Sequence, residues 1–215
     1  MHVILVAIAG GSASGKSWLA ERLRERLGAR ALRLSLDQFY RDLSHLPPGR
    51  RARVNFDHPR AVDWPAFVAA LRALRAGRPA RAPEYDFATH CRVGPPRRLA
   101  PRPCVLVDGL WPWRRPALRP LYALKVFLEC PPETQLRRRL RRDVQERGRD
   151  PRSVRRQFRE HVLPMQERFV TPQRRRADLV LRSPVSRATL AQLEARIREH
   201  LFPSKDRRAP AANIV

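Results

Sequence analysis

A glycine-rich loop between an apolar run and a helix-like segment constrains the fold of this chain more than any other feature. Residues 3–9 read VILVAIA, and the loop after them carries Gly10, Gly15, Lys16 and Ser17 at the spacing G-x-x-x-x-G-K-S. Glycines in such a loop tolerate positive φ, and backbone N–H groups can then close around phosphate oxygens at the N-terminus of the next helix. The pattern therefore predicts a buried strand, a phosphate-binding loop and a helix that begins at Lys16.

The same loop predicts a nucleoside triphosphate as ligand. We expect Lys16 to reach the β- and γ-phosphates and the Ser17 hydroxyl to bind Mg²⁺. A glycine-rich turn that binds nothing is the alternative, but the strand before the loop and the helix after it disfavour that interpretation. The chain has no N-K-x-D motif, which argues against a GTPase. The expected nucleotide-binding residues are Gly10, Gly11, Ser12, Ala13, Ser14, Gly15, Lys16 and Ser17.

Short apolar runs alternate with helical patterns along the rest of the chain. Runs that are apolar throughout are typical of buried parallel strands, and their alternation with helices predicts a doubly wound, mostly parallel α/β sheet of the P-loop NTPase type. We expect Pro164 to end or kink the fourth helix. The predicted strands are 3–9, 31–36, 104–109, 123–129 and 177–182, and the predicted helices are 16–27, 63–76, 132–147, 150–169 and 186–201.

The chain has 215 residues, 43% of them hydrophobic, which is enough for one sizeable core. We therefore expect one domain over 1–202. The segment 78–103, rich in Pro and Arg, interrupts the strand–helix rhythm and is expected to form a β-hairpin flap. Residues 203–215 show no periodicity and are expected to be a flexible tail.

The net charge of +25, from 45 basic and 20 acidic side chains, invites a nucleic-acid interpretation. Only Lys16, Lys125 and Lys205 are lysines, however, and the arginines are spread over the whole chain, a pattern that coding bias explains at least as well. The three cysteines form no C-x-x-C pair, which gives no support to a disulfide framework or a zinc site. With no apolar stretch near the roughly 20 residues of a membrane span, we expect a soluble, cytoplasmic protein.

Two aspartates follow predicted strands, at the edge where ligands bind in open α/β sheets. Asp37 could accept the proton of an attacking hydroxyl, although a helix cap is a fair alternative from its position alone. Asp108 ends a buried strand, where a lone carboxylate would be costly, so a Mg²⁺ partner is favoured over a turn-forming Asp-Gly.

The segment 137–150 reads RRRLRRDVQERGRD. It could be a solvated helix face, an RNA-binding surface, or a lid whose arginines neutralise a transferring phosphoryl group. The spacing alone does not separate these. In the lid interpretation Arg139, Arg142, Arg147 and Arg149 face the phosphates, and the solvated face is left to Arg137, Arg138 and Arg141.

These segments, taken together, resemble the uridine kinase (uridine–cytidine kinase) family. "GGSASGKS", "SLDQFY", "NFDHPRAVDW", "PEYDFATHCR", "VDGL", "RRLRRDVQERGRD" and "ADLVL" occur in the family's order and cover about residues 3–182. The resemblance implies transfer of the γ-phosphoryl group of ATP to the 5′-hydroxyl of uridine or cytidine, with Mg²⁺, by a protein that commonly forms homotetramers.

The resemblance also implies roles for individual residues. Asp37 matches the general base, and Asp57 matches the carboxylate that holds the ribose hydroxyls, with Arg149 as its partner. Flat bases favour aromatic walls, and their polar edges are read by matched donors and acceptors. The implied base-side residues are Tyr85 and His90 at the pyrimidine edge, Phe56 and Phe87 as aromatic walls, and Gln157.

Three departures from the family pattern stand out. Asp108 replaces the usual glutamate, "WPW" at 111–113 replaces smaller apolar residues, and Arg60 stands where an acidic residue is common. A related small-molecule kinase with another acceptor, such as phosphoribulose, pantothenate or a different nucleoside, is the first alternative, although Tyr85 and His90 argue against the first two acceptors. A P-loop protein that binds nucleic acid through its positive charge is the second.

Overall fold

The computed structural model of the protein describes residues 2–51 and 53–202. The tail expected over 203–215 lies outside the described residues, and the single domain over 1–202 stays a prediction. Among the described residues, no helix is both long and apolar enough to cross a membrane.

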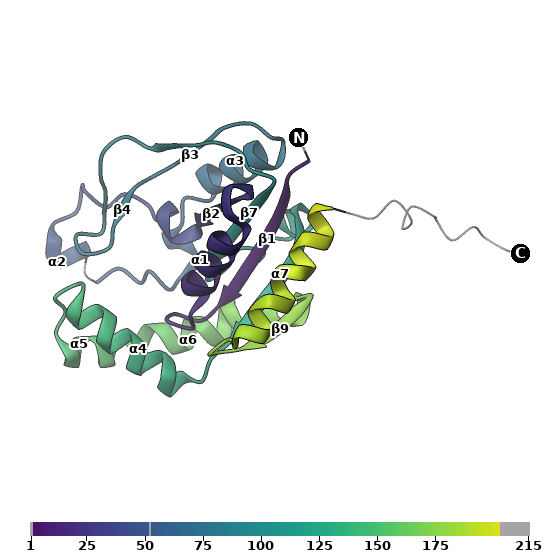
Figure 1. Cartoon of the computed structure of the whole chain (residues 1–215). Helices are drawn as coiled ribbons and strands as arrows, with labels where there is room; N and C mark the ends of the chain where they lie inside the picture. The colour runs from purple at the N-terminus through teal and green to yellow at the C-terminus, as the bar shows by residue number, and fades with distance from the viewer. Residues whose placement is uncertain (1, 52, 203–215) are drawn as a thin grey trace, which may run out of the picture.

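The five predicted strands form one parallel sheet in the order β2-β7-β1-β8-β9 (Figure 1). Parallel pairing runs in register from Ile4 opposite Cys104 to Ala9 opposite Gly109, so the loop after β1 begins at the carboxyl edge of the sheet. The strands are β1 Ile4–Gly10, β2 Ala31–Ser35, β7 Cys104–Gly109, β8 Tyr122–Glu129 and β9 Leu179–Arg182.

Helices cover both faces of the sheet, as a doubly wound fold requires. Alternate residues of β1 point to opposite faces: Val6 and Ile8 pack with helices α1 and α7, whereas Leu5 and Ala7 pack with α3. In Figure 1, α1 and α7 lie in front of the sheet. The helices are α1 Lys16–Leu27, α2 Pro48–Arg51, α3 Trp64–Arg75, α4 Pro132–Gln145, α5 Pro151–Gln157, α6 Leu163–Met165 and α7 Arg187–Leu201.

Local sequence signals set several helix ends. The Asp63 side chain accepts a hydrogen bond from the N–H of Ala66 at the start of α3, and Asp150 accepts one from Ser153 at the start of α5. After α3, Gly77 adopts a φ of 69°, the left-handed conformation that lets a helix stop.

The predicted helix 150–169 is confirmed in its extent, because helical turns run from Pro151 to Val170, but not all of these turns are α-helical. After α5 the backbone widens into a π-helix over Phe158–Val162, narrows to α6, and widens again over Gln166–Val170. Pro164, which lies in α6, does not end the helix. A proline has no N–H to donate, and the departures from α-helical geometry occur in the wide turns on either side of it.

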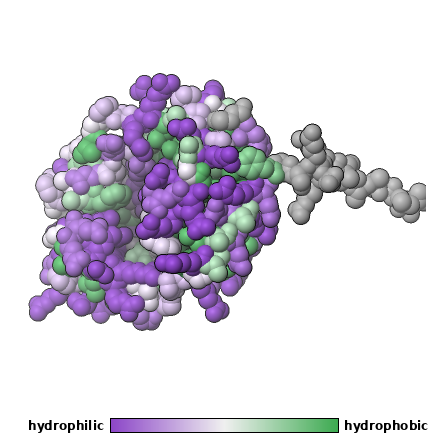
Figure 2. Space-filling model, viewed as in Figure 1, coloured by the Kyte–Doolittle hydropathy of each residue, from purple (hydrophilic) through white to green (hydrophobic). Residues whose placement is uncertain are grey.

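The segment 78–103 forms two short antiparallel pairs, as the flap prediction expects. Strand β3 Ala80–Ala82 pairs with β6 Arg97–Leu99, and β4 Tyr85–Asp86 pairs with β5 Cys91–Arg92. The two tryptophans of the Trp-Pro-Trp segment at 111–113 are part of the core. Trp111 and Trp113 are fully buried, and the Trp113 indole N–H donates to the Gln173 carbonyl. Hydrophilic residues cover most of the face seen in Figure 2.

Candidate active site

A cavity of about 550 Å³ lies where the loop after β1, the segment after β2, the β4–β5 hairpin and α4 converge. Most of the site residues predicted from the sequence line this cavity. Gly10, Gly11, Ser14 and Asp108 do not line it. The predicted residues that do are Ser12, Ala13, Gly15, Lys16, Ser17, Asp37, Phe56, Asp57, Tyr85, Phe87, His90, Arg139, Arg142, Arg147, Arg149 and Gln157.

The glycines of the loop act in two different ways. Gly15 adopts a φ of 100° at the N-terminus of α1, as expected, and Ala13 also has a positive φ. Gly10 does not. A Cβ there would lie 2.5 Å from the Leu128 carbonyl oxygen, so Gly10 is needed for close approach of β8 rather than for an unusual φ.

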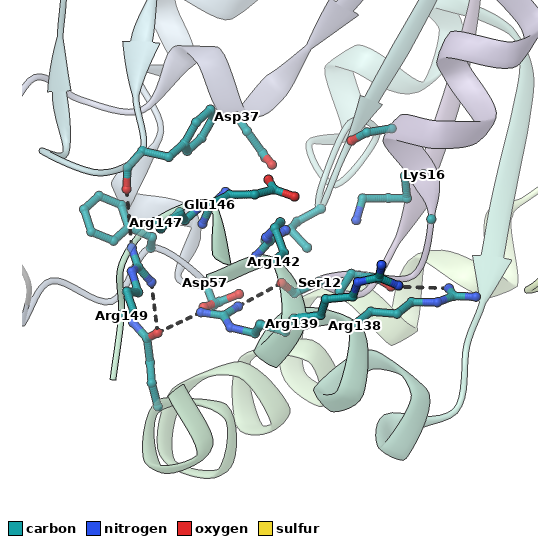
Figure 3. Close-up of a pocket in the computed structure, with 18 of the residues that line it drawn as sticks. Ser12, Lys16, Asp37, Asp57, Arg138, Arg139, Arg142, Glu146, Arg147 and Arg149 are labelled. Atoms are coloured by element: carbon teal, nitrogen blue, oxygen red, sulfur yellow. Dashed lines mark hydrogen bonds between the residues drawn. The ribbon is translucent and has the colours of Figure 1, made fainter. Parts of the chain in front are cut away.

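Lys16 is buried and points into the cavity (Figure 3). Its Nζ donates to the carbonyl of Gly11 at 2.7 Å. Burial lowers the pKa of the Lys16 ammonium, while the nearby carboxylates of Asp37 and Asp108 act in the opposite direction. The Lys16 ammonium is thus held at the loop by the Gly11 carbonyl, with the charges of Asp37 and Asp108 nearby.

Asp108 is neutralised by a residue that sequence reasoning missed. Arg33, on β2, donates to both carboxylate oxygens, from Nε at 2.8 Å and from Nη2 at 3.2 Å. The Ser17 hydroxyl donates to the same carboxylate at 2.8 Å. Asp108 is therefore not the lone carboxylate that the sequence argument assumed, because Arg33 supplies the opposite charge, and a Mg²⁺ role for Asp108 stays a prediction.

Asp37 is not a helix cap. Ser35 takes that role, accepting from the N–H of Asp37 at 3.4 Å, and the Asp37 carboxyl is left to face the cavity. Its Oδ1 is buried and has no hydrogen-bond partner within 2–51 and 53–202. Burial raises the pKa of the Asp37 carboxyl, partly offset by the charge of Lys16. Such an acid suits proton transfer.

Aromatic side chains form one wall of the cavity. Phe56 stacks on His90 with ring centroids 4.3 Å apart and an angle of 13° between the planes. Tyr40 contacts both Phe56 and Tyr85 edge to face. Tyr40 was not among the expected residues, although its place three positions after Asp37 in "DQFY" is a signal that could have found it.

His90 is held as a neutral ring. Arg149 Nη2 lies 3.1 Å from His90 Nε2, and because a guanidinium only donates, Nε2 is the acceptor and the ring proton is on Nδ1. Burial, together with the charges of Arg149 and Arg147, lowers the pKa of His90 to about 4. The wall therefore presents an uncharged imidazole at neutral pH.

The arginines of α4 and the following turn form a second wall, which faces Asp37 and Lys16 and meets the aromatic wall where Arg149 contacts His90 (Figure 3). Arg139 donates to Ser12 Oγ and to Gln157 Oε1, both at 2.8 Å. This links the phosphate-binding loop to α5. The lid interpretation of 137–150 is consistent with this placement.

The solvated-face assignment fits Arg137 and Arg141, which are both exposed, although Arg141 also lines the cavity. It does not fit Arg138, which is half-buried and lines the cavity. Arg138 donates to the Ser14 carbonyl at 3.2 Å and to Ser183 Oγ at 2.9 Å. The helix therefore has contacts to the loop that arginine spacing did not reveal. The other lining residues that were missed are Trp18, Leu110, Gln145 and Glu146.

Comparisons with known proteins agree with this geometry. The Phosphoribulokinase / Uridine kinase family matches residues 5–189. A protein named uridine kinase from Chloroflexus aurantiacus is 42% identical over 200 residues, covering 90% of this chain and 96% of that protein. One of the same name from Deinococcus deserti is 39% identical, covering 90% and 95%.

The fold is also that of a solved relative. The phosphoribulokinase from Rhodobacter spheroides superposes with a TM-score of 0.60 at 16% identity, over 84% of this chain and 70% of that one. At that identity the likeness bears on the fold alone. From the family match over 5–189 and the full-length relatives, the chain belongs to the Phosphoribulokinase / Uridine kinase family.

Proposed function

We propose that this protein is a uridine–cytidine kinase, which transfers the γ-phosphoryl group of ATP to the 5′-hydroxyl of a pyrimidine ribonucleoside. One observation carries the proposal: a single cavity joins a phosphate-binding loop to a wall of Phe56, Tyr85 and neutral His90. Flat aromatic faces suit a base, and a neutral imidazole with its proton on Nδ1 can donate to a base carbonyl. Relatives at 39–42% identity named uridine kinase support the same acceptor.

In this mechanism Asp37 takes the proton of the 5′-hydroxyl as that oxygen attacks the γ-phosphorus. The bond between the γ-phosphorus and the β–γ bridging oxygen breaks, and ADP leaves with the electron pair. Lys16, Arg139, Arg142 and Arg147 offset the negative charge on the phosphoryl oxygens. Asp57 holds the ribose hydroxyls together with Arg149. The Asp57 side chain is buried, and its backbone N–H donates to Asn55 Oδ1 in a turn that fixes its position.

The oxygen donors at this site fit Mg²⁺. Ser17 Oγ and the buried Asp37 Oδ1 are the candidates to hold it, and the described residues contain no group of three or more His, Cys, Asp or Glu side chains that would make a cage. That suits an ion that keeps several waters and binds phosphates. When bound, Mg²⁺ neutralises charge on the β- and γ-phosphate oxygens. Because Arg33 already pairs with Asp108, we assign Asp108 an indirect role through the Ser17 hydroxyl.

Two further parts of the proposal depend on family resemblance. We propose a cytoplasmic protein that assembles as a homotetramer. Sedimentation equilibrium in dilute buffer tests the assembly, and a monomer would contradict it.

An ADP-release assay over a panel of nucleosides and other alcohols tests the function. We expect uridine and cytidine to be the best acceptors, and Asp37→Asn to lower kcat by roughly 10²-fold or more while nucleotide binding is kept. Glu199→Gln, exposed on α7, is the matched control. Better turnover with a non-nucleoside acceptor would contradict the proposal, as would near-normal kcat in Asp37→Asn.

A further inference from the structure

Asp143, in the last turn of α4, is fully buried and surrounded by four guanidinium groups. Its Oδ1 lies 2.8 Å from Arg142 Nη2 and 3.3 Å from Arg147 Nη1. Its Oδ2 lies 3.3 Å from Arg139 Nε and 3.5 Å from Arg149 Nη1. One carboxylate thus contacts all four arginines of the lid.

Asp143 itself does not line the cavity, whereas all four arginines do. Asp143 therefore contacts the arginines from the side that faces away from the cavity. The arginines still have other N–H groups to use: Arg139 donates to Ser12 in the phosphate-binding loop, and Arg149 donates to His90 on the aromatic wall. The carboxylate is the shared partner of a group at the phosphate end and a group at the base end.

The charges around Asp143 do not balance. Four positive groups contact one negative group, which leaves this cluster of five side chains with an excess of three positive charges. Burial, and then the neighbouring charge of Arg142, lowers the pKa of Arg147 to about 10. Although burial by itself raises the pKa of the Asp143 carboxyl, Arg142 and Arg139 outweigh it and the pKa lies below its ordinary value. Asp143 stays ionised in the neutral range.

We propose that Asp143 is a positioning residue that gathers the four lid arginines into one array, so that they meet the triphosphate and the acceptor in a fixed arrangement. The proposal rests on the proposed function. Like-charged guanidiniums repel one another, and an anion shared by all four offsets that repulsion. The remaining excess charge attracts phosphate, and Asp143 itself stays out of contact with it.

This role predicts an unusual split of kinetic constants. Asp143→Asn keeps the shape of the side chain and removes its charge, so the lid becomes more positive but less ordered. We expect kcat to fall about 10-fold or more, because misplaced charge stabilises the transition state poorly. The KM for ATP should stay the same or fall, because one more net positive charge attracts the nucleotide.

The experiment compares wild type, Asp143→Asn and Glu133→Gln. Glu133 is exposed on the same helix, so its variant makes the same change in net charge away from the cavity. Steady-state kinetics give kcat and KM. Calorimetry with a non-hydrolysable ATP analogue at low and high salt gives affinity without turnover, and urea unfolding reports stability.

Lower kcat with retained analogue affinity and a steeper salt dependence supports the proposal. An unchanged kcat overturns it, and so does a loss of analogue affinity equal to the loss of kcat. Failure of Asp143→Asn to fold also overturns it, since the carboxylate would then be structural. If wild type does not phosphorylate uridine, the proposed function fails. The kcat of Asp143→Asn with the acceptor that the panel does identify, together with the calorimetric comparison, then decides the role of Asp143.

Discussion

His90 combines an uncommon backbone with a specific ring state. Its φ is +59°, its ring stacks on Phe56, and its Nε2 accepts from Arg149. Asparagine tolerates this backbone conformation better than alanine does, so His90→Asn removes the ring without adding backbone strain.

We expect His90→Asn to lower kcat/KM for uridine by about 1–3 kcal/mol and to leave ATP affinity nearly unchanged, because the ring contacts no phosphate. His45→Asn, exposed before α2, is the control. A parallel loss for both substrates would contradict the assignment.

The ring state of His90 makes a separate prediction about pH. With a pKa near 4, His90 stays neutral across the physiological range, so the KM for uridine should be flat from about pH 6 to pH 8. The folded-state pKa lies below the ordinary 6.5, so the stability from a neutral ring is present above pH 6.5 and is lost as pH falls toward 4. Histidine NMR checks this, and a His90 ring that titrates near 6.5 would contradict it.

Arg33 and Asp108 form the pair that sequence reasoning missed. The Asp108 side chain is 1% exposed, so removing Arg33 leaves a buried carboxylate without its opposite charge. We expect Arg33→Met to lower the free energy of unfolding by roughly 3 kcal/mol, measured with urea at pH 7. Arg196→Met, exposed on α7, should change it by less than about 0.5 kcal/mol. Equal stability of the two variants would show that Arg33 is dispensable.

At the scale of elements, the junction of β1 with α1 depends on close packing against β8. Gly10→Ala would place a Cβ 2.5 Å from the Leu128 carbonyl oxygen and 2.9 Å from Ser14 Oγ. We expect a loss of about 1–3 kcal/mol in the free energy of unfolding together with weaker ADP binding. Gly49→Ala in α2 meets nothing within 4 Å and should be neutral or stabilising. Normal ADP binding by Gly10→Ala would mean that the loop can shift away from β8.

At the scale of the whole molecule, the charge of +25 is the dominant property. The active-site arginines account for some of it, and most of the remainder is distributed over the surface. Self-repulsion of this size opposes compactness and is screened by salt. We expect the urea midpoint to rise as NaCl increases from about 20 mM to about 200 mM. A midpoint that falls with salt would show that the ion pairs outweigh the repulsion.

Local chemistry determined much of this protein from sequence alone. The phosphate-binding loop, the caps at Asp63 and Asp150 and the five buried strands each depend on residues a few positions apart, and the structure contains all of them. Parallel strands also bring their carboxyl ends to one edge, so Asp37 and the loop were expected to share a site. The roles of the individual site residues remain predictions.

Only the tertiary structure decided which charges meet. Arg33 and Asp108 are 75 residues apart, and no local pattern pairs them; the β2–β7 neighbourhood does. Arg138 reaches Ser14 across 124 residues, although spacing placed it on a solvated face. Asp143 stands four residues from both Arg139 and Arg147, a spacing that signals ion pairs, but its burial among four arginines follows from the packing of α4 and α5. The electrostatic energy between two charged groups is large only when they lie within a few ångströms of each other. The fold, rather than the order of residues in the chain, determines which groups lie that close.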